Sequence, residues 1–296
     1  MRISVVICTW NRADELRTTL DSLTQLVIPP GCTWELIVVN NGCTDETNAV
    51  IAEFEARLPI RSLFEGELGL SRARNRGSAA ARGDLILFTD DDVSVEASWL
   101  EAYVDAGERW PDASYFGGVI QPRFERSPPR WVEEQRSALV RMLATRDFGP
   151  IARPFAAGEF PFGPNMAVRA DAFQIASFDE RRGRRGNEQR RGSETSLLAK
   201  LADEGLQGVW VPEARVWHRV PVCRMTLRYF WRHYRGEGMD HFRYGRPLPD
   251  RALWRFLQLT SLALLWLGLG RTDWVQPMQR AANLGGQMRE QRSTRT

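Results

Sequence analysis

Three consecutive aspartates, Asp90, Asp91 and Asp92, directly follow an apolar run at residues 85–89. Ligands of open α/β sheets bind beyond the carboxyl ends of the strands, which is where this triplet would lie. In an extended segment the carboxylates of Asp90 and Asp92 point to one side and that of Asp91 to the other. Carboxylates placed in this way, together with substrate phosphates, suit Mg²⁺ or Mn²⁺. The alternative is an acidic loop in which Asp92 or Ser94 caps a helix, but the position after a buried strand favours the metal.

Two further polar segments follow the first two apolar runs of the chain, at residues 9–12 and 40–45. They would lie at the same sheet edge as the aspartates, where their backbone and amide groups could satisfy the donor and acceptor edge of a pyrimidine base. Ordinary turn chemistry is the alternative, because Asn41 with Gly42 suits a bend and Thr44 suits a helix N-cap. For the second segment taken singly, the turn is the better interpretation.

The elements that must position these residues alternate in the first half of the chain. Apolar runs indicate strands, and leucine-type spacing indicates helices between them. The expected strands are at 3–8, 36–39, 61–64, 85–88, 115–120 and 208–211, and the expected helices at 14–26, 45–58, 71–81, 99–110, 132–144 and 194–204. Strands that are apolar on both faces and separated by helices indicate an α/β fold with a parallel sheet covered on both sides.

Composition narrows the classes of protein that remain. The chain has 40 basic and 37 acidic residues, for a net charge of +3, and Lys200 is its only lysine. This balance is too near neutral for a nucleic-acid binder. The four cysteines form no CxxC pair and have no zinc spacing with the three histidines, which indicates a reduced, cytoplasmic protein. The apolar run at 256–270 is shorter than the roughly 18 residues that span a bilayer.

Four segments in the first 120 residues resemble the family 2 glycosyltransferases, which have the GT-A fold. They are residues 5–12, 38–45, 69–77 and 87–92, in the family's order and at plausible spacing. The resemblance implies a Rossmann-like nucleotide-binding sheet, mixed and flanked by helices, with a C-terminal helical extension. The expected GT-A domain is 1–220, with a nucleotide-sugar half at 1–120 and an acceptor half at 121–220, and the helical extension is 221–296.

The resemblance also implies a nucleoside-diphosphate sugar donor and a divalent cation, Mn²⁺ or Mg²⁺. The aspartate triplet would be the DxD motif, with Asp91 also near the donor. Asp92 would bind the metal that bridges the diphosphate, and Asp90 would approach the ribose or the water shell of the metal. The base of the donor would lie against the two polar loops, at Thr9, Trp10, Asn11, Arg12 and Asn41.

Asn41 departs from the family pattern, because many relatives carry an aspartate at this place. An amide can still hydrogen-bond uracil, but the preference of a carboxylate for the uracil N–H is lost. A UDP-sugar is therefore the first expectation for the donor, and GDP- and dTDP-sugars are the alternatives.

Inverting transfer needs a general base that deprotonates the acceptor hydroxyl. Glu194 stands where the family shows the second acid of a Glu-Asp pair that opens a helix, and Ser193 replaces the first acid. A glutamate is longer than the usual aspartate and can still reach the acceptor. The alternative is that Glu194 only stabilises the helix dipole, with Ser193 as the N-cap.

Four other residues are candidates for contacts in the site. The resemblance places Asn165 under the donor sugar and gives His218 a metal or phosphate contact. Arg74 could bind donor phosphates bidentately, and Asn75 lies beside it on the same small-residue helix. The alternatives are a turn asparagine after Pro164, a packed histidine, and an exposed arginine on an amphipathic helix.

Two arginine clusters stand out from the composition. Residues 181–192 hold six arginines between glycines just before Glu194, which fits either a lid over an anionic ligand or a solvated basic loop. Residues 224–235 alternate arginines with aromatic residues at helical spacing. With the apolar run at 253–269, this tail could rest peripherally on the anionic inner face of the cell membrane, or form a folded helical cap.

The sequence thus predicts a metal-dependent, inverting glycosyltransferase that moves a sugar to a hydroxyl of a polysaccharide, a lipid-linked intermediate or a small natural product. Two alternatives come from other classes of protein. A nucleotidyltransferase has a related sheet, but the loop at residues 9–12 lacks the usual glycine-rich segment. A sugar-nucleotide-binding module without catalysis is conceivable because Asn41 and Ser193 replace acids.

Overall fold

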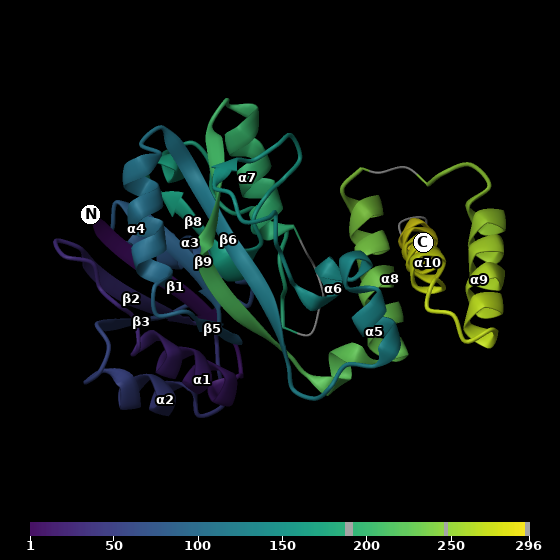
Figure 1. Cartoon of the computed structure of the whole chain (residues 1–296), viewed down its shortest axis with the longest axis horizontal. Coiled ribbons are helices and arrows are strands. Elements are labelled where there is room, and N and C mark those ends of the chain that lie inside the picture. The colour runs from purple at the N-terminus through teal and green to yellow at the C-terminus, as the bar shows by residue number, and fades with distance from the viewer. Residues whose placement is uncertain (187–191, 246–247, 294–296) are drawn as a thin grey trace. The chain divides into compact units, whose positions relative to one another are not determined.

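The computed structural model describes residues 1–186, 192–245 and 248–293 (Figure 1). These residues form two compact units. The first contains 1–123, 144–186 and 192–219, and the second contains 124–143 and the C-terminal residues from 220. In this division residues 124–143 group with the C-terminal helices, although they precede the last strand of the first unit.

The first unit is built on a mixed nine-stranded sheet, as the family resemblance implies, whereas the strand pattern alone indicated a parallel sheet. Its parallel part has the order β3-β2-β1-β4, and an antiparallel strand, β8, continues it beside β4. Beyond β8 follow β6, β9 and β5, and the short β7 pairs with β9. The bounds are β1 (Arg2–Thr9), β2 (Thr33–Asn40), β3 (Ile60–Phe64), β4 (Leu85–Asp90), β5 (Val93–Val95), β6 (Ala113–Phe124), β7 (Arg153–Pro154), β8 (Met166–Arg169) and β9 (Gln207–Val220).

The strand register brings the polar segments to one edge, as predicted. Thr9 at the end of β1 pairs with Asn40 at the end of β2, and Cys8 pairs with Asp90 at the end of β4. The three loops that follow these strands therefore leave the sheet side by side.

Alternating side chains of the strands fill two cores, one on each face of the sheet. Val5, Leu36 and Leu87 pack with helices α1, α2 and α4, whereas Val6 and Phe88 pack with α3 and α7. Burial on both faces explains why these strands are continuous apolar runs. The helices of this unit are α1 (Ala13–Leu23), α2 (Thr47–Phe54), α3 (Leu70–Ala80), α4 (Trp99–Arg109) and α7 (Ser193–Asp203).

The prediction of a single helix at 132–144 is wrong. The segment consists of α5 (Arg130–Glu134), a 3-10 turn at Arg136–Ala138 and α6 (Val140–Leu143). The backbone leaves the helical region at Gln135 and at Leu139. Val132 and Leu143 then turn into the core of the second unit from separate short helices.

The second unit is helical, with α8 (Leu227–Arg243), α9 (Ala252–Gly268) and α10 (Val275–Ser293). Helix α10 lies between α8 and α9 (Figure 1). Gly238 of α8 and Gly286 of α10 let these two helices touch, because a Cβ at either position would come within 2 Å of a carbonyl oxygen on the other helix. Among the helices of the described residues, none has the length and apolar character needed to cross a bilayer.

Candidate active site

A buried ion-pair cluster joins the loop after β1 to the aspartate triplet. Arg12 donates from Nη1 to Asp91 Oδ1 at 2.7 Å and from Nη2 to Asp92 Oδ2 at 2.9 Å, and Thr9 donates its hydroxyl to Asp91 Oδ2. Burial disfavours the charged form of Arg12, but the two carboxylates outweigh it and raise the pKa of Arg12. Burial also raises the pKa of Asp91, to about 7, with Asp92 and Asp90 adding to the rise and Arg12 and Thr9 opposing it. Arg12 therefore fixes the turn that presents Asp92.

The expected alternation of the three aspartates is wrong. Asp91 and Asp92 lie in a turn between β4 and β5 and share one guanidinium, whereas Asp90 at the end of β4 contacts Arg74. The short strand β5 begins at Val93. Asp91 and Asp92 therefore form a turn, although the prediction treated all three aspartates as one extended segment. Asp91 is only 4% exposed and holds Thr9 and Arg12 in place, so it has a structural role in the loop.

His218 lies beside Asp92, on the strand that pairs with β5. The register aligns Val93 with His218, and Nε2 of His218 lies 3.5 Å from Oδ2 of Asp92. The sequence places these residues 126 positions apart, and the antiparallel pairing of β5 with β9 brings them together. An imidazole and a carboxylate in this arrangement are a ligand pair that a divalent cation could use.

A second cluster centres on Arg74, whose guanidinium lies between Asp90 and Glu194. Nη2 of Arg74 is 3.2 Å from Asp90 Oδ1, and Nη1 is 3.4 Å from Glu194 Oε2. The Arg74 side chain is only 4% exposed, but Asp90 and Glu194 are partly open to solvent. Burial opposes the charge on Arg74, and the two carboxylates outweigh it and raise its pKa. Arg74 is thus a buried cation that links the DxD segment to the N-terminus of α7, and the exposed-helix alternative is wrong.

Two residues that the sequence did not single out hold Arg74 in position. The guanidinium lies over the ring of Phe178, 5.6 Å from the ring centre. Gly163 leaves room for it, because a Cβ at this glycine would lie 2.2 Å from Nη2 of Arg74. Gly163 lies two residues before Asn165 in the chain.

Replacing Gly163 with alanine is expected to lower turnover by about 10- to 100-fold, since small misplacements of catalytic groups have effects of this size. The added methyl group would push the buried guanidinium of Arg74 away from Asp90 and Glu194, so Tm is expected to fall as well. The measurement is the initial rate of nucleoside diphosphate release, with Tm recorded in parallel. Gly268→Ala, where a Cβ meets nothing within 4 Å, is the matched control. An unchanged rate in Gly163→Ala would contradict a role for the position of Arg74.

Asn165 does not have the predicted role as a sugar contact. It is fully buried, and its Nδ2 donates to the carbonyls of Val119 and Ala214. Its Oδ1 accepts hydrogen bonds from Trp99 Nε1 and from the Tyr103 hydroxyl. With all four hydrogen-bonding positions occupied, Asn165 is a structural link between the sheet and α4.

Asn41 also uses its amide within the protein. Nδ2 donates to the carbonyls of Glu65 and Glu67, and Oδ1 accepts from the backbone N–H of Gly69. It therefore shapes the loop at 65–69 in front of α3, and its role as a base contact stays a prediction.

The remaining residues of the first loop keep their predicted place at the sheet edge. Asn11 accepts a hydrogen bond from the backbone N–H of Thr44 and thereby joins the loops after β1 and β2. Trp10 faces Gly186, where a Cβ would lie 3.4 Å from the indole ring. These two residues, together with Arg12, remain the candidates for the base-binding side of the site.

The described part of the arginine-rich loop packs on the start of α3. Asn75 exchanges hydrogen bonds with the backbone of Phe178, so it positions the loop. Ser71 donates its hydroxyl to the carbonyl of Arg182, and the N–H of Leu70 donates to that of Arg184. Arg190 and Arg191, which the sequence included in the cluster, lie outside the described residues.

The mixed sheet and the carboxylate-bearing edge define the class of protein. The chain has the GT-A fold of the glycosyltransferases, as predicted. A family model described as glycosyl transferase family 2 matches residues 4–174, more than half of the chain. The chain belongs to this family and is a glycosyltransferase.

Relatives and solved structures agree with this assignment. The chain is 26% identical over 250 residues to the glucosyl-dolichyl phosphate glucuronosyltransferase of Haloferax volcanii, covering 81% of this chain and 78% of that one. It is 26% identical over 256 residues to the succinoglycan biosynthesis protein ExoM of Rhizobium meliloti, covering 85% and 77%. Among structures, the mannosyltransferase PcManGT of Pyrobaculum calidifontis, in complex with GDP-Man and Mn²⁺, matches with a TM-score of 0.59 and 19% identity over 95% of this chain and 73% of that one.

Proposed function

We propose that this glycosyltransferase inverts the configuration of the sugar that it moves from a nucleoside-diphosphate donor to an acceptor hydroxyl. The observation that carries the proposal is the bridge from Asp90 through Arg74 to Glu194. It places the residue with the expected role of base next to the DxD segment, although the two are 104 positions apart in the chain.

The proposed reaction is a single displacement. The acceptor oxygen forms a bond to the anomeric carbon while the bond from that carbon to the phosphate oxygen of the donor breaks. Glu194 takes the proton of the attacking hydroxyl, and the electron pair of the broken bond leaves with the nucleoside diphosphate. Arg74 orients the Glu194 carboxylate, because its guanidinium lies at one of the carboxylate oxygens.

Asp92, His218 and Asp90 fit a divalent cation. Asp92 Oδ2 and His218 Nε2 lie 3.5 Å apart, and Asp90 is partly exposed at the same edge. Donor phosphates would complete the ligand set of such a cation. A nitrogen ligand favours Mn²⁺ over Mg²⁺, which prefers oxygen. Such a cation would neutralise the charge that develops on the leaving diphosphate.

The substrates are proposed from chemistry and from relatives. The names of the two curated relatives point to a glycan that is lipid-linked or part of a polysaccharide, which supports such an acceptor for this chain. Small natural products are the second class. For the donor, a UDP-sugar is proposed first and GDP- and dTDP-sugars next, with the base against the loops after β1 and β2.

The experiment is a thermal-shift screen of UDP-, GDP- and dTDP-sugars with and without Mn²⁺, followed by an assay for nucleoside diphosphate release. We expect one nucleotide class to raise Tm only when Mn²⁺ is present and to be cleaved when an acceptor is added. The anomeric configuration of the product, read by NMR, tests the mechanism. Retention of configuration, or cleavage that is equally fast after chelation, would overturn the proposal.

A further inference from the structure

One side of helix α9 is apolar and exposed. Leu253, Leu257, Leu264 and Leu265 are each more than half exposed. Spacings of four and seven residues place Leu253, Leu257 and Leu264 on one side of the helix, and Leu265 adjoins them. The opposite side is buried at Ala263 and packs on α10. Contiguous exposed apolar surface of this kind is uncommon on a monomeric protein and marks an interaction surface.

The charge of the chain is divided unequally. Residues 220–296 contain 13 arginines and five acidic residues, although the whole chain carries only +3. The segment that contains α9 thus carries a net positive charge, and the rest of the chain a net negative one.

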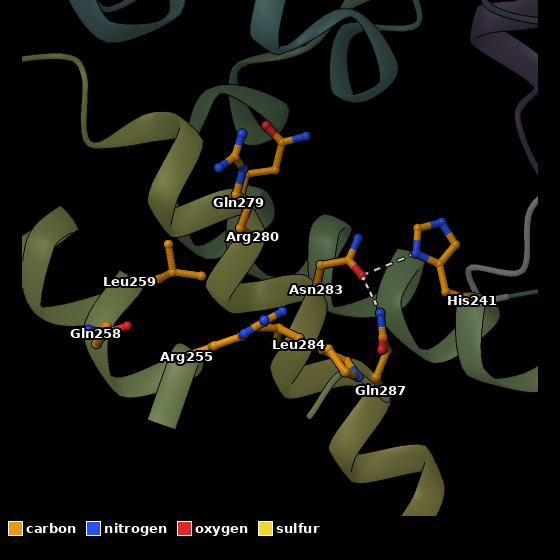
Figure 2. A pocket seen from close by; sticks show the side chains of 10 residues that line it. His241, Arg255, Gln258, Leu259, Gln279, Arg280, Asn283, Leu284 and Gln287 are labelled. Atoms are coloured by element: carbon orange, nitrogen blue, oxygen red, sulfur yellow. Dashed lines mark hydrogen bonds between the residues drawn. The ribbon is translucent and has the colours of Figure 1, made fainter. Parts of the chain in front are cut away.

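An open groove of about 490 Å³ lies next to the apolar strip of α9. Arg255 reaches from α9 toward α10, and Arg280 projects from α10 at the other end of the groove (Figure 2). The remaining polar lining consists of amide side chains and His241, without a carboxylate. In the described part of the chain, neither guanidinium has an acidic partner. Guanidinium groups with amide donors beside them suit phosphate oxygens.

We propose that α9 and its groove are a docking surface for an anionic phospholipid membrane. The leucine strip enters the boundary between headgroups and acyl chains, and Arg255 and Arg280 bind lipid phosphates. Helix α9 has 17 residues, or roughly 25 Å of length, and it carries no acidic residue. An apolar strip flanked by arginines is the pattern of a helix that lies in the membrane interface.

A second copy of the chain fits this surface less well. A twofold interface would place the same patch of both copies face to face, so two strongly cationic segments would oppose each other. That repulsion disfavours the dimer, whereas an anionic leaflet attracts the same arginines.

Helix α8, which the sequence also offered for membrane contact, has a different role. Phe230 and Tyr234 are buried in the core of the second unit, and the aromatic side of α8 therefore faces inward.

The test is co-sedimentation of the full chain with vesicles of phosphatidylcholine alone and of phosphatidylcholine mixed equally with phosphatidylglycerol. We expect binding to the mixed vesicles that weakens with salt, and little binding to the neutral ones. Arg255→Gln with Arg280→Gln should lower the partition coefficient by about 30-fold, and Leu257→Gln with Leu264→Gln by about 100-fold. All four side chains are on the helical surface, so the circular dichroism spectrum should stay unchanged.

Matched controls lie on the first unit. Arg109→Gln with Ile151→Gln removes one exposed arginine and one exposed apolar side chain, and binding should stay within about twofold of the unsubstituted protein, as for surface changes elsewhere. Equal binding of the α9 variants and the controls would overturn the proposal. So would a dimer in light scattering that the leucine substitutions dissociate. Vesicle binding needs no donor or acceptor, so its failure would leave the proposed transfer reaction untouched.

Discussion

Turnover of the Glu194→Gln variant is expected to fall by about 10²- to 10⁴-fold, the usual contribution of a positioned general base. Glutamine has almost the same size and keeps an oxygen that can accept from Arg74 Nη1, but it cannot take up the acceptor proton. Affinity for the donor should stay within about twofold, because binding of the donor does not need that proton transfer. Single-turnover kinetics and donor titration by calorimetry would measure the two effects separately.

Glu204→Gln is the matched control for this prediction. Glu204 is an exposed glutamate at the other end of α7, so its replacement changes the charge equally without touching Arg74. If Glu194→Gln turns over as fast as Glu204→Gln, Glu194 is not the general base. A loss of donor affinity without loss of turnover would instead make Glu194 a binding residue.

The sheet and its polar edge were predictable because local pattern and fold agree there. Strands such as residues 36–39 are apolar on both faces, and only a sheet covered by helices on both sides buries them fully. Parallel strands must then bring their carboxyl ends together, which places the loops after β1, β2 and β4 in one row. These inferences need periodicity and topology alone, and the register confirms them.

The roles of individual polar residues were harder to predict, because they depend on partners that are distant in sequence. Asn165 and Asn41 have the right residue type for ligand contact, but their partners come from β6, β9 and the loop at 65–69. Nothing near either residue in the sequence shows that its amide is already occupied. Similarly, the pairing of β5 with β9 turns Asp92 toward His218, and a three-residue strand gives no usable periodicity.

Arg74 shows how one buried cation can organise a site that sequence analysis treats as separate motifs. Its charge is buried at a cost that only nearby carboxylates can offset, so Asp90 and Glu194 stabilise it as much as it orients them. The glycine at position 163 follows from this arrangement, because a side chain there would leave no room for the guanidinium. Glu194 and Asp90 are therefore coupled in stability through Arg74.

Replacing Asp92 with asparagine is expected to lower transfer by about 10³-fold and to abolish its dependence on Mn²⁺, since metal stabilisation of the leaving group contributes several kcal/mol. The amide keeps the shape of the side chain and can still accept from Arg12 Nη2, but it removes the negative charge beside His218. The measurement is the initial rate as a function of Mn²⁺ concentration, with calorimetric titration of Mn²⁺ in the presence of the nucleoside diphosphate.

Asp105→Asn, at an exposed position of α4, is the matched control and should retain the full response to Mn²⁺. Because Arg12 keeps Asp91 as a partner in the Asp92 variant, Tm should fall by only a few degrees, which separates loss of metal from loss of fold. If Asp92→Asn responds to Mn²⁺ as the control does, Asp92 is not a metal ligand. His218→Asn tests whether the imidazole shares the cation with Asp92. We expect this variant to lose part of its Mn²⁺ affinity, and an unchanged affinity would show that His218 is not a ligand.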